Sequence, residues 1–301
     1  MTPDRSNSLL WNGTVRKLSL ADQLLVAQKS GFGKLSITPW QVARWQEGGF
    51  SVADMRAMAE DRGVKLAQLD PLARWAPKWR PEGVDPQSLS FINTGTDDFF
   101  RIAGAFRVEA MTTICTAPSG SVNRNQLTDA FASICRRADD QGLRCDLEFI
   151  PMYCVSDLNM AWQIVRDGGM KNSGIVFDYW HFMRGNPDFE LLGAIPGDRI
   201  SAVQLSDALM IVPDGRNASD DGLNFRLPCG EGEFPIDRIT RTLDRIDALH
   251  NVGPEIFSVR FDSLSADEIV TEIGKFFPAM LDRARNPASA IAAQQQASSI
   301  R

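Results

Sequence analysis

Histidine is scarce in this sequence, and its scarcity limits the kinds of site that the chain can build. Only two histidines, His181 and His250, occur among the 301 residues. A site that holds several metal ions through many histidine ligands is therefore excluded. The five cysteines are an odd number, are widely spaced and form no C-x-x-C pair. This pattern predicts reduced, buried thiols rather than a disulfide framework.

Long apolar runs, a leader and an excess of basic charge are missing as well. No window approaches the roughly 18 apolar residues of a membrane span. The start, MTPDRSNSLLWNG, lacks the apolar centre of a signal peptide. A net charge of −6 argues against a surface that follows nucleic-acid phosphates. We therefore expect a cytoplasmic protein with neither a membrane nor a nucleic acid as its partner.

What the sequence does contain is a repeated alternation of short apolar runs with amphipathic segments. The first unit joins the run at 9–11 to a helical pattern at 20–30, and the last joins 255–263 to 266–283. The other strands are expected at 33–40, 64–71, 110–118, 146–155, 174–181 and 199–207. Eight such units predict a (β/α)8 barrel, and the first strand is not followed by the G-x-G-x-x-G of a dinucleotide-binding sheet. We expect one barrel domain over 1–285 and a mobile, low-complexity tail over 286–301.

The candidate functional residues are polar side chains late in the predicted strands, because chemistry in such barrels lies at the carboxyl ends of the strands. Glu148 is the first candidate, since it lies in the otherwise apolar run DLEFIPMYCV. Burying an unpaired carboxylate costs several kcal/mol, so Glu148 needs a cation or a proton. Asp207 and Asp262 are expected to cap the helices that follow them rather than to act in catalysis. The remaining candidates are Asp178, His181, Gln204 and Arg260 at strand ends, with Arg226 and Glu231 from the loop at 226–236.

Four local motifs, in this order, resemble the sugar phosphate isomerase/epimerase family, the barrels related to xylose isomerase and endonuclease IV. They are LEFIPM, the D-x-x-H of Asp178 and His181, VQLSD with Gln204, and the R-x-x-x-G-E-G that begins at Arg226. The resemblance covers about 9–285. It implies a xylose isomerase-like barrel that moves protons next to a carbonyl group. It also implies a divalent ion held by a Glu on strand five, an Asp on strand six, a His on strand seven and a Glu on strand eight.

The chain departs from that ligand pattern on strands seven and eight. Glu148 and Asp178 match, whereas we assign Gln204 to the histidine position and Arg260, in SVRF, to the second glutamate position. Arg260 would bring a permanent cation whose planar guanidinium bridges two carboxylates. We therefore expect Arg260 to replace the metal, and we expect no cofactor. Glu148, Asp178 and Gln204 remain as weak ligands for Mn²⁺, Mg²⁺ or Zn²⁺.

The same reasoning predicts a role for each site residue. Glu148, His181 and Arg260 are the predicted catalytic residues, with Glu148 and His181 handling protons. Arg226 is expected to clamp an oxyanion or a phosphate. Aromatic side chains near the predicted mouth of the barrel suit a sugar ring or an aromatic substrate. Three polar residues join these aromatic side chains. The predicted substrate-binding residues are Trp11, Trp40, Trp75, Tyr153, Trp180, Gln204, Arg226 and Glu231.

The predicted function is proton transfer on a small carbonyl- or hydroxyl-bearing molecule, sugar-like or aromatic. The reaction is an isomerisation, an epimerisation, or a related lyase or dehydratase step. The alternative is a barrel that binds a ligand without turning it over. The oligomeric state stays open, a homodimer included.

Overall fold

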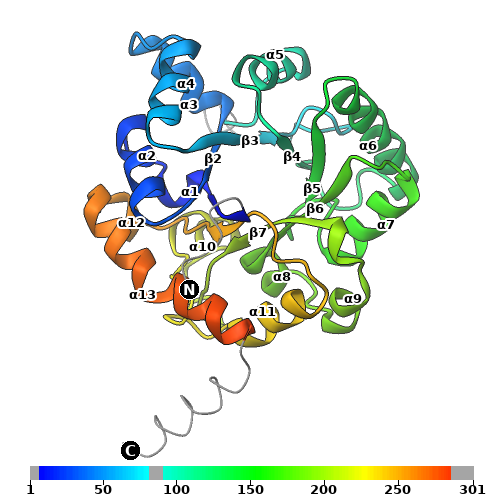
Figure 1. Ribbon diagram of the computed structural model, residues 1–301. Helices are drawn as coiled ribbons and strands as arrows, with labels where there is room; N and C mark the ends of the chain where they lie inside the picture. The colour runs from blue at the N-terminus through cyan, green and yellow to red at the C-terminus, as the bar shows by residue number, and fades with distance from the viewer. Residues whose placement is uncertain (1–6, 81–90, 286–301) are drawn as a thin grey trace, which may run out of the picture.

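The computed structural model describes residues 7–80 and 91–285, and it confirms the predicted (β/α)8 barrel. Eight parallel strands follow one another around a single sheet in sequence order, with helices packed outside them (Figure 1). A parallel bridge between Ser8 and Val252 joins the two ends of the sheet. The two edges approach closely at Gly253, where a Cβ would lie 1.8 Å from the carbonyl oxygen of Leu9. Glycine is therefore needed at the seam of the barrel.

Seven of the eight strands overlap the predicted runs, and the eighth does not. The predicted strand at 255–263 is wrong, because the last strand ends before it and a short helix occupies part of that segment. The real strand has the sequence VGP, whose glycine and proline are poor strand formers. It is held by pairing with the seventh strand. The strands are β1 (Leu9–Leu10), β2 (Lys34–Ile37), β3 (Lys65–Leu72), β4 (Ala110–Ile114), β5 (Arg144–Glu148), β6 (Ser173–Asp178), β7 (Ile200–Leu205) and β8 (Val252–Pro254).

The long helices lie where the amphipathic pattern predicts them, and five others were not expected, namely α1, α3, α8, α10 and α12. Side-chain caps begin three of them. Thr38 forms a capping box at α3, Asp178 caps α8 and Asn217 caps α10. The helices are α1 (Asn12–Val15), α2 (Leu20–Lys29), α3 (Pro39–Glu47), α4 (Val52–Asp61), α5 (Thr96–Phe106), α6 (Arg124–Asp139), α7 (Leu158–Gly168), α8 (Tyr179–Arg184), α9 (Phe189–Ala194), α10 (Ala218–Asn224), α11 (Ile236–Arg245), α12 (Val259–Asp262) and α13 (Ala266–Arg285).

Two apolar layers hold the barrel together. The larger lies between the sheet and the surrounding helices. The smaller fills the inside of the barrel and contains Leu9, Trp11, Val176 and Ala202, all buried. Val176 and Ala202 each lie two residues before a polar residue at the end of their strand. The small layer is therefore a floor beneath the polar strand ends.

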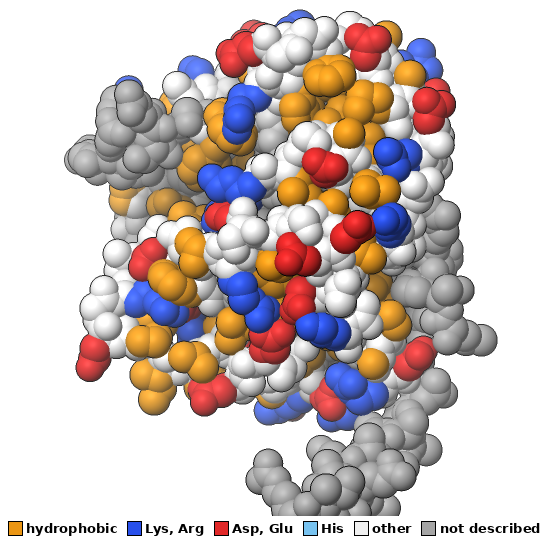
Figure 2. All heavy atoms as spheres, turned by 90° about the vertical axis from the view of Figure 1, so that its left-hand side faces the viewer, with side chains coloured by type: hydrophobic (Ala, Val, Ile, Leu, Met, Phe, Trp, Pro, Cys, Tyr) orange, Lys and Arg blue, Asp and Glu red, His pale blue; other side chains and the backbone are white. Residues whose placement is uncertain are grey.

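The outer surface carries charges of both signs. On the face formed by α2, α4, α12 and α13, acidic and basic side chains are interspersed with apolar ones (Figure 2). Among the described residues, no helix is long and apolar enough to cross a membrane. The predicted tail at 286–301 lies outside the described residues, and the division of the chain at residue 285 stays a prediction.

Candidate active site

A cavity of about 430 Å³ lies at the carboxyl ends of the strands, where the barrel fold places active sites. Its deep end is polar, and its walls are largely apolar. The polar side chains at the deep end come from strand ends and from the segments that follow them: Asn12, Asp70, Glu148, His181, Arg226 and Glu255. Further polar residues of the lining are Arg16, Thr38, Gln41, Thr116, Ser219 and Asn224. The apolar side chains include Trp40, Phe91, Ile92, Ile114, Ile150, Met152, Tyr153, Trp180, Leu223 and Phe257.

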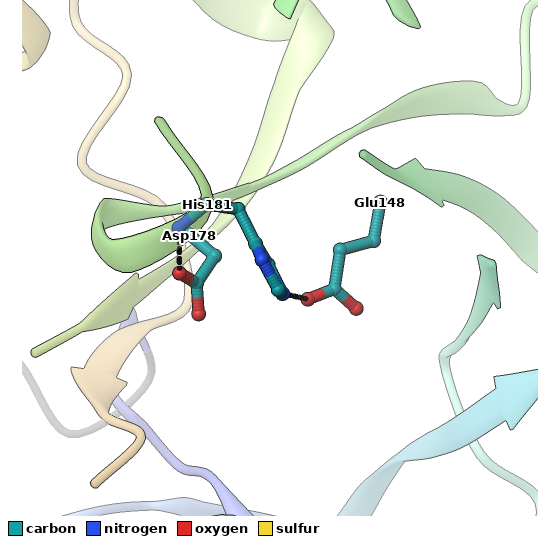
Figure 3. A group of neighbouring side chains, drawn as sticks. All are labelled: Glu148, Asp178 and His181. Carbon is teal, nitrogen blue, oxygen red and sulfur yellow. Dashed lines mark hydrogen bonds and ion pairs between the residues drawn. The ribbon is translucent and has the colours of Figure 1, made fainter. Parts of the chain in front are cut away.

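Glu148, Asp178 and His181 form a compact group at the ends of β5 and β6 (Figure 3). Glu148 Oε1 lies 3.2 Å from His181 Nε2, and both side chains are 8% exposed. Asp178 accepts a hydrogen bond of 2.7 Å from the backbone N–H of His181, which fixes the first turn of α8. One ligand atom from each of the three residues lies within 4.8 Å of the others. The D-x-x-H spacing thus puts the imidazole between two carboxylates.

Arg226 is the cation of this site. Its Nη1 donates to Asp178 Oδ2 at 2.6 Å and lies 3.6 Å from Glu255 Oε2. Its Nε donates to the carbonyl oxygen of Gly222 in α10. The guanidinium also lies over the rings of Trp180 and Phe257. Because Arg226 is only 2% exposed, its charge interacts with these acids rather than with solvent.

The acids around Arg226 have pKa values that are shifted in opposite directions. Burial alone would raise the pKa of Asp178, but Arg226 and His181 outweigh it and hold that pKa below its usual range. Glu255 has a pKa raised well above its usual range by burial and by repulsion from Glu148, with Arg226 offsetting only part of this. Burial, together with the charge of Glu148, raises the pKa of Asp70 to about 8. The deep end of the cavity therefore holds more carboxyl groups than its one buried guanidinium neutralises.

Gln204 lies at the end of β7, in register with Asp178 on β6. Paired residues of neighbouring strands point to the same side of the sheet, so both side chains face the barrel interior. Gln204 is fully buried, yet neither its Oε1 nor its Nε2 has a hydrogen-bond partner among the described residues. A buried amide without partners is costly, and this one lies beside the acidic group.

The expectation that Arg260 enters the site is wrong. Arg260 lies in α12, its side chain is 46% exposed, and it pairs with Glu231 and Glu272 at the surface. The residue that follows β8 into the interior is Glu255, which is 2% exposed. The barrel therefore retains an acid directly after strand eight, and Arg260 does not replace it. Glu231, predicted to contact the substrate, lies with Arg260 outside the cavity.

Three of the five predicted aromatic contacts line the cavity, namely Trp40, Tyr153 and Trp180. Trp11 lies instead in the barrel floor, where its Nε1 donates to the carbonyl oxygen of Val203. Trp75 packs in the outer core and donates to the carbonyl oxygen of Ile114. Both indoles bury their N–H groups against backbone oxygens, which is how a core tryptophan is satisfied.

Asp207 and Asp262 are structural residues, although neither caps a helix as expected. Asp207 accepts four backbone N–H groups, from Ala208, Gly230, Gly232 and Phe234. It thereby fixes the turn that carries the G-E-G motif. Asp262 pairs with Arg16 through two hydrogen bonds of 2.7 and 2.8 Å.

Asp70 and Asn12 were missed by the sequence reasoning. Asn12 Nδ2 lies 3.3 Å from Asp70 Oδ2 and joins the start of α1 to the end part of β3 at the deep end of the cavity. Asp70 lies in the run VKLAQLDP, whose strand was predicted correctly. The rule used for Glu148, a polar residue late in a barrel strand, also selects Asp70.

The sequence profile of the xylose isomerase-like TIM barrel family matches residues 24–278. The chain belongs to this family. The inosose isomerase of Bacillus velezensis is 28% identical over 135 residues, which are 44% of this chain and 46% of that protein. A 3-dehydroshikimate dehydratase of Pseudomonas aeruginosa is 29% identical over 111 residues, 36% of this chain and 17% of that protein. The alignments thus span about half or less of these relatives.

Solved structures of the family share the fold at low identity. The IolI protein with a bound zinc atom aligns over 92% of this chain and 99% of its own, with a TM-score of 0.77 and 19% identity. An L-ribulose 3-epimerase aligns over 95% and 98%, with a TM-score of 0.68 and 14% identity. These likenesses extend over nearly the whole barrel, whereas the sequence alignments cover only part of it.

Proposed function

We propose that this protein is an enzyme that moves a proton at a carbon next to a carbonyl group, in an isomerisation, epimerisation or dehydration of a small molecule. The observation that carries the proposal is the contact between Glu148 and His181, a carboxylate and an imidazole joined at 3.2 Å at the deep end of a cavity. Relatives named as isomerases, an epimerase and a dehydratase support the reaction class.

The roles follow from position and charge. Glu148 takes the proton from the substrate carbon, and His181, in contact with it, transfers a proton to or from the substrate oxygen. Arg226 keeps Asp178 ionised, so that the helix carrying His181 begins at a fixed place. Delivery of a proton to the opposite face of the same carbon gives epimerisation, and its delivery to the neighbouring carbon gives isomerisation. Departure of a hydroxyl group, as water, from the carbon next to the deprotonated one gives dehydration.

A divalent cation fits the donors of this site. Glu148 and Asp178 supply carboxylate oxygens that lie within 4.8 Å of each other and of a ring nitrogen of His181. Glu255, which contacts the same arginine as Asp178, would add a carboxylate oxygen, and the partnerless Gln204, in register with Asp178, would add an amide oxygen. Oxygen donors of this kind favour Mn²⁺ or Mg²⁺. Such an ion would add positive charge that polarises a carbonyl group. The expectation of weak or absent binding rested on Arg260, on the missing imidazole at Gln204 and on the missing fourth carboxylate. Because Arg260 lies outside the site and Glu255 supplies an acid after β8, we propose Glu148, Asp178, Gln204 and Glu255 as the ligands.

Hydrogen exchange tests the proposal directly. An α-hydroxy ketone incubated with the protein in D₂O should acquire deuterium at the carbon next to its carbonyl group, as followed by proton NMR. Glu148→Gln should slow the exchange by about 100-fold or more, the usual size of a general-base contribution, while ligand affinity stays within a fewfold. Arg260→Gln is the control, because its side chain lies outside the cavity. Ligand binding without exchange in the wild type would identify a non-catalytic barrel instead.

A further inference from the structure

Three large apolar side chains at the mouth of the cavity are exposed to solvent. Trp40, Phe91 and Leu223 are 38%, 45% and 42% exposed, and they come from α3, from the segment before α5 and from α10. Exposing such side chains is unfavourable unless they meet an apolar partner. Behind them lie Met152, Tyr153 and Phe257, so the apolar surface runs inward from the rim.

The arginines that line the cavity are already paired. Arg16 forms two hydrogen bonds with Asp262 and a third with the carbonyl oxygen of Leu223. Arg226 is held by Asp178, Glu255 and Gly222. Lysine is missing from the lining residues that the structure describes. A phosphate group would therefore find no unpaired arginine or lysine side chain among the lining residues that the structure describes.

Beyond the deep end, most polar residues of the lining are already hydrogen-bonded within the protein: Thr38 with Gln41, Thr116 with Trp79, and Asn224 with Asp220 and Arg16. The polar groups proposed to act on the substrate lie at the deep end. Asn12, Asp70, Glu148 and His181 offer hydrogen bonds there. A polyhydroxylated chain reaching from this end to the mouth would lose water along the apolar walls. It would find few polar side chains there that are not already hydrogen-bonded, with Gln41 Nε2 among these few. A molecule with a polar end and an apolar body matches both parts.

We propose that the substrate carries an apolar ring, aromatic or alicyclic, which packs against Trp40, Phe91 and Leu223. Its carbonyl- or hydroxyl-bearing end reaches Glu148 and His181, and it has no phosphate group. This assignment of a substrate class rests on the proposed function for the reacting end. The apolar ring is inferred only from the apolar side chains that line the cavity.

Three probes test the assignment. 2-Hydroxy-1-phenylpropan-1-one and 3-hydroxybutan-2-one are both α-hydroxy ketones, and they differ in carrying a phenyl or a methyl group on the carbonyl carbon. Fructose 6-phosphate supplies the hydroxylated, phosphorylated alternative. By titration calorimetry, the phenyl ketone should bind at least tenfold more tightly than each of the others. Trp40→Ala and Leu223→Ala should each weaken binding of the phenyl ketone by about fivefold or more, and binding of the methyl ketone by less than twofold.

Phe50→Ala is the matched control, because Phe50 is 42% exposed and does not line the cavity. It should leave all three affinities unchanged. Equal affinities for the phenyl and methyl ketones, or tighter binding of the sugar phosphate, would overturn the substrate class. Deuterium exchange into the same probes separates this result from the proposed function. Tight binding of the phenyl ketone without exchange into any probe supports the substrate class and contradicts the proton-transfer reaction.

Discussion

At the scale of single residues, the site is governed by which arginine is buried. Arg226 and Arg260 both stand near acids in the sequence, but only Arg226 is enclosed by Asp178 and Glu255. Removing one partner of a buried ion pair leaves an unpaired charge, which costs far more than losing an exposed pair.

Arg226→Met should therefore lower the free energy of unfolding by about 3–5 kcal/mol. Arg260→Met, the matched exposed change, should alter it by less than about 0.5 kcal/mol. Urea denaturation followed by circular dichroism measures both values. Similar losses for the two variants would mean that the acids at the deep end of the cavity do not depend on Arg226.

Asp70 gives the stability a pH dependence whose sign follows from its raised pKa. Burial raises the pKa from 3.8 to about 8, so at pH values between these limits the folded protein holds a proton that the unfolded chain has released. This contribution to stability is fully present below pH 3.8 and is lost as the pH rises through about 8.

Asp70→Asn should remove that dependence while keeping the contact with Asn12. The difference in unfolding free energy between wild type and variant should change by a few kcal/mol, in the direction of a weaker wild type, from pH 5 to pH 8. Denaturation series at four pH values measure it. A constant difference would mean that Asp70 is ionised in the folded protein throughout.

At the scale of elements, the short strand β8 decides both closure of the barrel and the contents of the site. Its three residues pair with β7 and bring Gly253 against Leu9 on β1. The strand then delivers Glu255 to Arg226. A change that pushes β8 away from β1 should therefore disturb the site as well as the seam.

Gly253→Ala should destabilise the fold severely, because the added Cβ would lie 1.8 Å from the carbonyl oxygen of Leu9 and the backbone must move. Gly274→Ala in α13 is the matched control, because a Cβ there meets nothing within 4 Å. That control should be neutral or stabilising by up to about 1 kcal/mol, since alanine is the better helix former. Thermal melting of the two variants decides the point, and a well-folded Gly253→Ala protein would contradict the tight seam.

At the scale of the whole molecule, the proposed metal site links five elements of the barrel. Glu148, Asp178, Gln204 and Glu255 come from β5, β6, β7 and the end of β8, and Arg226 comes from the loop before α11. An ion held by all four ligands binds the folded chain far better than the unfolded one, so it stabilises the whole barrel.

Mn²⁺ added to chelator-treated protein should therefore raise its melting temperature. At 100 times the dissociation constant, the gain in stability is roughly 2.7 kcal/mol. Gln204→Leu and Glu255→Gln should reduce the rise, whereas Glu231→Gln, outside the cavity, should not. An unchanged melting temperature in all proteins would mean that Arg226 alone neutralises the acids.

Local sequence patterns were enough to predict the fold. They also identified Glu148 and Asp178, two of the four buried carboxyl groups described for the site. The eight alternating units predict the barrel because each strand and helix carries its own periodicity. Glu148, Asp178 and His181 were found because a strand end and a D-x-x-H spacing are short-range features. The sequence by itself thus determined the architecture, the group of Glu148, Asp178 and His181 that lies together in the structure, and the family to which the resemblance pointed.

Only the tertiary structure decided which charges meet. Strand β8 has three residues, two of them glycine and proline, so its position depends on its neighbours rather than on its own sequence. Because the last strand was predicted too late in the sequence, Arg260 was assigned to the position that Glu255 occupies. A cation was thus predicted where the structure has an acid. Trp11 and Trp75 are tryptophans like Trp40 and Trp180, which line the cavity, but they lie in the barrel floor and the outer core. Burial and pairing are long-range properties, and in this protein they separate the residues of the site from those of the scaffold.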